Sequence, residues 1–306
     1  MRILHFSDIH LGTRWRGVPK KKWVGKRAIG AANLLAGRYR RFLDNGPKLE
    51  ALARFRRDQD VDLVLFTGDY TALGLEAEFH AARRAVQPLM DAPLGYVNVP
   101  GNHDIYLLDV VRDRAFERHF GDTLHSDLPE FRTDGPWPLV RLFDPSVAVV
   151  AVNSARPNPW PWRSSGRLPV KQLGALIRVL DDPRVRDRFV FVLNHYPPRL
   201  VDGNRDRWVH RMVNDDEFLA ACAELRRGAI LSGHVHRRYL VRVPEVNPPI
   251  VCCGSTTMAG REGLWVYEVD GDAVRAVPGS WNGTGYVLEP GAAVDFSKFA
   301  PRADRT

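Results

Sequence analysis

Short apolar runs rich in β-branched residues recur along the chain, and each run ends in a polar or glycine-containing turn. Runs of this length and composition are typical of buried strands. Six of them lie at residues 3–6, 61–66, 95–99, 147–152, 189–193 and 229–231. Segments with a helical pattern lie between several of them, at residues 75–90, 107–120, 170–180 and 215–226. This alternation predicts an α/β fold in which helices cover the strands.

The pattern changes after about residue 238 to strands that are joined by turns, without long helices. The predicted strands lie at residues 239–243, 250–253, 264–269 and 273–278. We expect them to form a terminal sheet that completes the same core. The sequence therefore predicts a single domain over residues 1–297, followed by a loose polar tail at residues 298–306.

Composition narrows the class of protein. The chain has 306 residues, 44% of them hydrophobic, which is enough to bury a sizeable core. No apolar run reaches the roughly 18 residues that span a bilayer, and no leader precedes the first apolar run. Three cysteines, two of them adjacent, do not make a disulfide framework. These features predict a soluble cytoplasmic protein.

Charge is distributed unevenly along the chain. Residues 14–57 hold 14 Lys or Arg residues against Asp44 and Glu50, whereas the remaining residues carry slightly more acidic than basic side chains. The formal net charge of +8 therefore comes from one segment. We interpret residues 14–57 as a basic insertion in an otherwise acidic globular body.

Side chains that bind metals follow five of the predicted strands. Because the carboxyl ends of strands in an α/β sheet meet at one edge, these side chains are expected to lie close together. Seven side chains are candidate ligands, which is more than one ion with open water positions would use. They are Asp8, His10, Asp69, Asn102, His195, His234 and His236.

The ligand types indicate which ions would bind. Carboxylates and imidazoles together favour divalent Mn, Fe or Zn, and we expect two such ions. Asp69 is the expected bridge between them, because it ends an inner strand behind Gly68, which permits close approach. A shared carboxylate would hold the ions roughly 3.5 to 4 Å apart, the spacing of two-metal hydrolases.

Five motifs in this order resemble the calcineurin-like metallophosphoesterases. The resemblance spans residues 1 to about 260 and implies a four-layer α/β/β/α sandwich, with a dinuclear metal site at the C-terminal ends of the strands. It implies that Asp8, His10, Asp69 and His236 hold one ion, and that Asp69, Asn102, His195 and His234 hold the other. The motifs are Asp8-x-His10, Gly68-Asp69, Gly101-Asn102-His103-Asp104, His195 and Gly233-His234-x-His236.

The expected chemistry is hydrolysis of a phosphate ester by a metal-bound hydroxide, since metal coordination lowers the pKa of water towards about 7 in favourable sites. His103 neighbours a ligand without being one, so it is the candidate general acid or transition-state stabiliser. Asp104 is expected to orient or charge the His103 imidazole. The loops at residues 153–155 and 254–256 resemble family loops near the metal centre and are candidate supports of it, and the aromatic loop at residues 157–163 is a candidate substrate wall.

Several substrates fit these motifs. A small phosphodiester or phosphomonoester is favoured, with cyclic nucleotide phosphodiesterases the most similar subgroup. The alternatives are pyrophosphatases of nucleotide-linked lipids, which typically carry Arg where this chain has His103, and nucleases. From another class, the chain could be a catalytically silent metal-bound scaffold, against which the intact ligand set argues.

The basic insertion has an amphipathic pattern. Trp15 and Trp23 flank three lysines at residues 20–22, and residues 26–43 are predicted to form one helix with apolar and cationic faces. Such a helix often only covers a core. Aromatic anchors and clustered cations also favour an anionic membrane surface, and the protein would then be peripheral to the membrane. Nucleic acid is the less favoured anionic partner.

Overall fold

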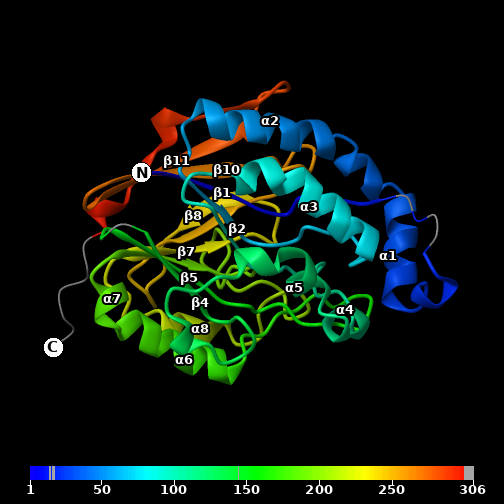
Figure 1. Ribbon diagram of the computed structural model, residues 1–306, viewed down its shortest axis with the longest axis horizontal. Coiled ribbons are helices and arrows are strands. Elements are labelled where there is room, and N and C mark those ends of the chain that lie inside the picture. The colour runs from blue at the N-terminus through cyan, green and yellow to red at the C-terminus, as the bar shows by residue number, and fades with distance from the viewer. Residues whose placement is uncertain (14, 16–17, 144, 300–306) are drawn as a thin grey trace.

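The computed structural model describes residues 1–13, 15, 18–143 and 145–299. Two β-sheets face each other, and helices cover their outer faces (Figure 1). The predicted four-layer α/β/β/α sandwich is confirmed. No helix in the described part of the chain is long and apolar enough to cross a bilayer.

The first sheet contains the N-terminal strands, and its order is β12-β11-β10-β1-β2-β3, with β13 beside β11. Strands β1, β2 and β3 are parallel, with Ile3 opposite Leu63 and Val64 opposite Tyr96. The strands are β1 (Arg2–Phe6), β2 (Leu63–Phe66), β3 (Tyr96–Asn98), β10 (Leu264–Asp270), β11 (Ala273–Trp281), β12 (Tyr286–Leu288) and β13 (Val294–Asp295).

The second sheet has the order β4-β5-β6-β7-β9-β8. Its inner strands β5, β6, β7 and β9 are parallel, so their carboxyl ends lie at one edge. The strands are β4 (Leu139–Phe143), β5 (Val147–Ala151), β6 (Phe189–Leu193), β7 (Gly228–Ser232), β8 (Arg238–Val241) and β9 (Ile250–Cys253).

Helices α2 and α3 cover the first sheet, α6, α7 and α8 cover the second, and α1 and α4 lie at one end of the sandwich (Figure 1). The helices are α1 (Lys26–Leu35), α2 (Asn45–Asp58), α3 (Glu76–Met90), α4 (Leu108–Arg112), α5 (Ala115–Phe120), α6 (Val170–Asp181), α7 (Pro183–Arg186) and α8 (Asp215–Ala221). Short 3-10 helices are η1 (Lys20–Lys22), η2 (Arg38–Phe42), η3 (Gly121–Thr123), η4 (Pro129–Phe131), η5 (Pro290–Ala292) and η6 (Phe296–Lys298).

Strand β6 shows why its sequence is apolar at every position. Phe189, Phe191 and Leu193 belong to the core shared with the first sheet, whereas Val190 and Val192 belong to a second core with α6 and α8. Side chains alternate between the two faces of a strand. A strand that is buried on both faces therefore reads as a continuous apolar run.

Four details differ from the sequence predictions. The helix predicted over residues 26–43 ends at Leu35, because the chain turns at Gly37 with a positive φ of 126°. The helix predicted over 107–120 divides at Arg114, which has a left-handed backbone. The helix predicted over 215–226 ends at Ala221. The C-terminal strands form no separate sheet, because β8 and β9 join the second sheet and β10 to β13 join the first.

Strand β4 was missed, because its run is interrupted by Arg141. The basic insertion supplies α1, η2 and α2 between β1 and β2. Arg14, Arg16 and Gly17 of that insertion and residues 300–306 of the expected tail lie outside the described residues. The single domain over residues 1–297 stays a prediction.

Candidate metal centre

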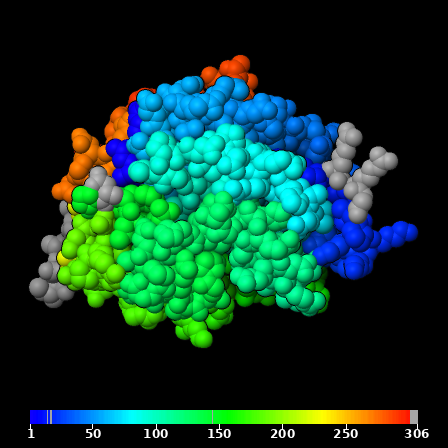
Figure 2. All heavy atoms as spheres, in the orientation of Figure 1, coloured from blue at the N-terminus to red at the C-terminus, as the bar shows by residue number. Residues whose placement is uncertain are grey.

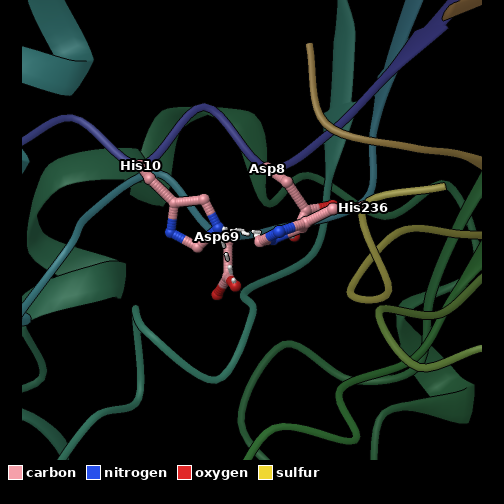
Figure 3. Close-up of side chains that lie close together, drawn as sticks. All are labelled: Asp8, His10, Asp69 and His236. Carbon is pink, nitrogen blue, oxygen red and sulfur yellow. Dashed lines mark hydrogen bonds and ion pairs between the residues drawn. The ribbon is translucent and has the colours of Figure 1, made fainter. Parts of the chain in front are cut away.

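All seven predicted ligands meet where the two sheets face each other. Asp8 and His10 follow β1, Asp69 follows β2, and His236 lies in the turn between β7 and β8. Figure 3 shows these four side chains converging from three separate segments. Each offers one ligand atom, and the four atoms lie within 4.8 Å of one another.

The backbone at these positions is unusual. Asp8, His10, Asp69, His234 and His236 all have positive φ angles, between 41° and 70°. Residues other than glycine rarely adopt this left-handed region, and such strain concentrates at functional sites. Each strand therefore turns sharply at its end and directs its side chain into the space between the sheets.

Two glycines permit the loops to approach closely. Gly68 has a φ of 100°, and a Cβ there would lie 2.6 Å from the Gly101 backbone nitrogen and 2.7 Å from His195 Nδ1. A Cβ on Gly101 would overlap the Asp69 carboxylate. The expected role of Gly68 is thus confirmed by the contacts, and Gly101 has the same role on the facing loop.

In the first candidate ligand group, formed by Asp8, His10, Asp69 and His236, the ligand atoms face one another. His10 Nε2 lies 2.9 Å from His236 Nε2 and 3.6 Å from Asp69 Oδ2. His236 Nε2 lies 3.2 Å from Asp8 Oδ1, a buried oxygen without a hydrogen-bond donor in the described part of the chain. Because the other nitrogen of His10 faces the carbonyl of Thr71 at 3.3 Å, a neutral His10 directs its Nε2 lone pair at these atoms.

The second ligand group is built in the same way around Asn102. Its Oδ1 lies 3.1 Å from His195 Nε2 and 2.9 Å from His234 Nδ1. His195 Nδ1 donates to the Thr67 carbonyl at 2.7 Å, and His234 Nε2 donates to the His210 carbonyl at 3.0 Å. The nitrogens that face Asn102 Oδ1 are therefore acceptors, like that oxygen. A cation bound between these three acceptors would remove their mutual repulsion.

The charge states of the candidate ligands also favour binding of cations. Burial lowers the pKa of His10 to about 3 and that of His195 below its usual value, so both imidazoles are neutral and available as ligands. Burial, together with the charges of Asp8 and Asp104, raises the pKa of Asp69 well above its usual value. Buried carboxylates that repel each other beside neutral imidazoles are a donor set for divalent metal ions.

Asp104 is placed differently from the sequence prediction. Its carboxylate accepts hydrogen bonds from the backbone amides of Asp69, Tyr70, Thr71 and Gly101, at 2.9 to 3.1 Å. The prediction that Asp104 orients the His103 imidazole is therefore wrong. Asp104 instead clamps the loop that carries Asp69 against the loop that carries Asn102.

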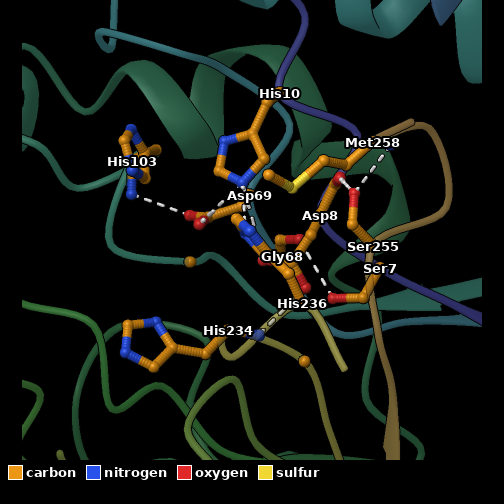
Figure 4. Close-up of polar contacts among 12 residues, drawn as sticks. Ser7, Asp8, His10, Gly68, Asp69, His103, His234, His236, Ser255 and Met258 are labelled. Atoms are coloured by element: carbon orange, nitrogen blue, oxygen red, sulfur yellow. Dashed lines mark hydrogen bonds and ion pairs between the residues drawn. The ribbon is translucent and has the colours of Figure 1, made fainter. Parts of the chain in front are cut away.

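His103 is oriented by backbone rather than by a carboxylate. Its Nδ1 donates to the Ala72 carbonyl at 2.6 Å, which leaves Nε2 as the nitrogen available to a ligand. Its backbone N–H donates to Asp69 Oδ1 at 2.7 Å, and Figure 4 shows this contact beside the centre. Burial and the nearby His10 lower the pKa of His103 well below its usual value.

Several supporting residues come from outside the strand-end motifs. Ser255 Oγ donates to the Asp8 carbonyl at 2.7 Å, so one of the two loops predicted as supports braces the first ligand loop. Thr257 Oγ1 donates to the Ile9 carbonyl at 2.9 Å. Asn45, at the start of α2, donates to the same carbonyl at 2.7 Å. Sequence reasoning missed Asn45, because it begins a helix and follows no strand that leads into the site, and it missed Thr257, which lies one residue beyond the loop predicted as a support.

A cavity of about 1560 Å³ lies over the centre. His10, Asp69, Asn102, His103, His234 and His236 are among its lining residues. The other walls come from α1 and η2, from the aromatic loop at residues 161–164 and from the loop around His210. The aromatic loop and the basic insertion therefore both frame the centre.

A model of the calcineurin-like phosphoesterase family matches residues 1–238. The chain belongs to the calcineurin-like phosphoesterase family. The family predicted from the motifs is thus confirmed, and with it the class of metal-dependent phosphoric ester hydrolases. Members of this calcineurin-like family use a dinuclear divalent metal centre, in agreement with the two ligand groups.

Solved structures share the fold of this calcineurin-like phosphoesterase. A dimetal phosphatase from Danio rerio is similar with a TM-score of 0.63 and 14% identity, over 96% of this chain and 98% of the other. A purple acid phosphatase from yellow lupin (Lupinus luteus) seeds has a TM-score of 0.58 and 10% identity, over 96% of this chain and 53% of the other. This chain thus spans about half of the lupin protein's length. No curated protein matches the sequence.

Proposed function

We propose that this calcineurin-like phosphoesterase hydrolyses small phosphodiesters or phosphomonoesters at a centre of two divalent ions, with Mn, Fe or Zn as the metals. Asp8, His10, Asp69 and His236 would hold one ion. Asp69, Asn102, His195 and His234 would hold the other. Mixed carboxylate and imidazole donors support these metals over Ca or Mg.

The position of Asp69 carries this proposal. Its Oδ2 lies 3.6 Å from His10 Nε2 in the first group and 3.5 Å from His195 Nε2 in the second. One oxygen thus faces both groups, which suits a carboxylate shared between two ions. A single-ion site or a structural ion pair would not need two sets of acceptors that share one oxygen.

When bound, two divalent ions would lower the pKa of water and neutralise charge on the phosphoryl oxygens. The chain's own residues would position that chemistry and move the proton. His103 is held by the Ala72 carbonyl with its Nε2 available, so it would act beside the leaving oxygen as general acid or transition-state stabiliser. Asp104 would act as a positioning residue, because it fixes the loops that carry Asp69 and Asn102.

Turnover of bis(p-nitrophenyl) phosphate with added Mn²⁺ tests this proposal, followed by a panel of cyclic nucleotides, nucleotide-linked lipids and DNA. We expect hydrolysis that is abolished by Asp69→Ala. Asp181→Ala is the matched control, because Asp181 is exposed at the end of α6. Folded protein that is inactive with Mn²⁺, Fe²⁺ and Zn²⁺ would instead favour a silent metal-bound scaffold.

A further inference from the structure

Exposed apolar side chains gather at the mouth of the cavity. On the basic insertion, Leu35 is 78% exposed, Leu43 59%, Tyr39 52% and Ile29 45%. All four line the cavity. An amphipathic segment that only covered a core would bury these side chains. Here Phe42 is buried, whereas its apolar neighbours face solvent.

The insertion is fixed in this orientation. Arg27 and Lys22 both contact the Asp109 carboxylate at the start of α4, at 3.1 Å and 2.5 Å. Trp15 and Trp23, which were predicted to be membrane anchors, contact each other as tilted rings with centroids 5.2 Å apart and pack partly buried against the core. These contacts hold α1 at the end of the sandwich, where it projects from the body (Figures 1 and 2).

Exposed tryptophans lie near the cavity, and Trp162 is one of its lining residues. Trp160 and Trp162 stack with centroids 5.3 Å apart, and both are more than half exposed. Trp208 is 61% exposed and lies 5.6 Å from the Arg163 guanidinium. Lys26 on α1 donates to the Arg163 carbonyl at 3.0 Å, so α1 is joined to the aromatic loop. We call these exposed side chains together the apolar rim. Five of them line the cavity, namely Ile29, Leu35, Tyr39, Leu43 and Trp162, and the other two, Trp160 and Trp208, contact Trp162 and Arg163 beside it.

Cations surround the rim. Seven Lys or Arg side chains line the cavity against three carboxylates, one of which is the ligand Asp69. Within the described residues, Arg38, Arg40 and Arg41 form no ion pair. Lys20 and Lys21, in η1 of the same insertion, are also exposed. Exposed apolar groups and unpaired cations thus occur on the same face.

We propose that the apolar rim docks on the surface of an anionic lipid bilayer. Tryptophan and tyrosine favour the headgroup level, and cations favour anionic headgroups. Aliphatic side chains such as Leu35 and Leu43 suit acyl chains, whereas nucleic acid would be bound by phosphate contacts and by stacking on aromatic rings. The docking goes beyond the hydrolytic function proposed above, and it places the mouth of the centre against the membrane.

Co-sedimentation with vesicles of phosphatidylcholine and phosphatidylglycerol tests the docking. We expect binding at low salt, little binding to pure phosphatidylcholine, and weaker binding in high salt. Leu35→Ser with Leu43→Ser should reduce the partition coefficient at least tenfold, and Arg40→Ala with Arg41→Ala should do the same at low salt. Val170→Ser with Ile177→Ser is the matched control, because both residues are exposed on α6 away from the cavity.

Thermal melts of each variant show whether it is folded. A blue shift of tryptophan emission in the wild-type protein on addition of the same vesicles gives a second expected result that needs no variant. Wild-type protein that neither sediments nor shifts its emission at low salt would overturn the docking, as would equal losses in the α6 control. Binding to double-stranded DNA without binding to vesicles would also overturn it. Hydrolysis of bis(p-nitrophenyl) phosphate in the same preparation reports separately on the proposed function.

Discussion

The strand-end loops and the basic insertion border the same cavity but differ in burial and in the contacts that hold them. Asp8, Asp104 and His195 are completely buried, and each has carbonyl, amide or ligand-group contacts on several sides. Leu35 and Tyr39 are largely exposed, and the insertion is held mainly through Lys22, Arg27 and Asp109. Buried polar groups require partners. The centre is therefore determined by its hydrogen bonds, whereas the rim can vary without loss of the fold.

The largest expected effect lies at the centre. His103→Ala should reduce the rate by about 10² to 10⁴ for substrates with poor leaving groups, and by less for nitrophenolate, which needs little protonation. Metal content should stay at the wild-type value, because His103 is not a ligand. His125→Ala is the matched control, since His125 is exposed. An equal loss for good and poor leaving groups would contradict the acid role.

Asp104→Ala should mainly affect stability. It removes the acceptor for backbone amides at Asp69, Tyr70, Thr71 and Gly101. Buried donors without acceptors cost about 1–3 kcal/mol each, so we expect a loss of about 3 kcal/mol or more in urea unfolding. Arg40→Ala, at an exposed position of η2 beside the rim, should change stability by less than about 0.5 kcal/mol. Similar losses for the two variants would remove the contrast between the regions.

Glu78 gives a pH effect away from the centre. Burial raises its pKa to about 7, although it accepts hydrogen bonds from the amides of Leu73 and Leu75. The folded state thus holds this proton more tightly than the unfolded state. The stabilisation is complete below about pH 4.5 and is lost as the pH rises through 7, by on the order of 1–3 kcal/mol. The free energy of unfolding in urea should differ less between pH 5 and pH 8 for Glu78→Gln than for the wild-type protein. The same difference in both proteins would show that Glu78 is not the source of the pH effect.

The smallest effect is expected for the salt bridge at the base of the insertion. Lys22 and Asp109 are partly exposed, at 32% and 28% of their side chains. Exposed ion pairs contribute about 0–1 kcal/mol. Lys22→Ala should therefore lower the free energy of unfolding only slightly, and less at high salt. A loss as large as that of Asp104→Ala would mean that the insertion is part of the stable core.

The sequence could bring the candidate ligands to one place because each of them follows a strand whose two faces are buried. Asp69 and His195 could be placed from apolar runs alone, since parallel strands end at one edge. The contacts of Asp104 were not predictable, because they involve backbone amides that come together only in the fold. The exposure of Leu35 was also beyond the sequence. An amphipathic pattern shows that a helix has an apolar face, but it does not show what that face contacts.

Metal content of purified Asp69→Ala and Asp8→Ala tests the central claim most directly, because one oxygen of Asp69 lies near His10 in the first group and His195 in the second. We predict two ions per chain in the wild-type protein and fewer ions in Asp69→Ala than in Asp8→Ala, measured by mass spectrometry of the metals after dialysis. An Asp69→Ala protein that keeps two bound ions would contradict the bridging assignment.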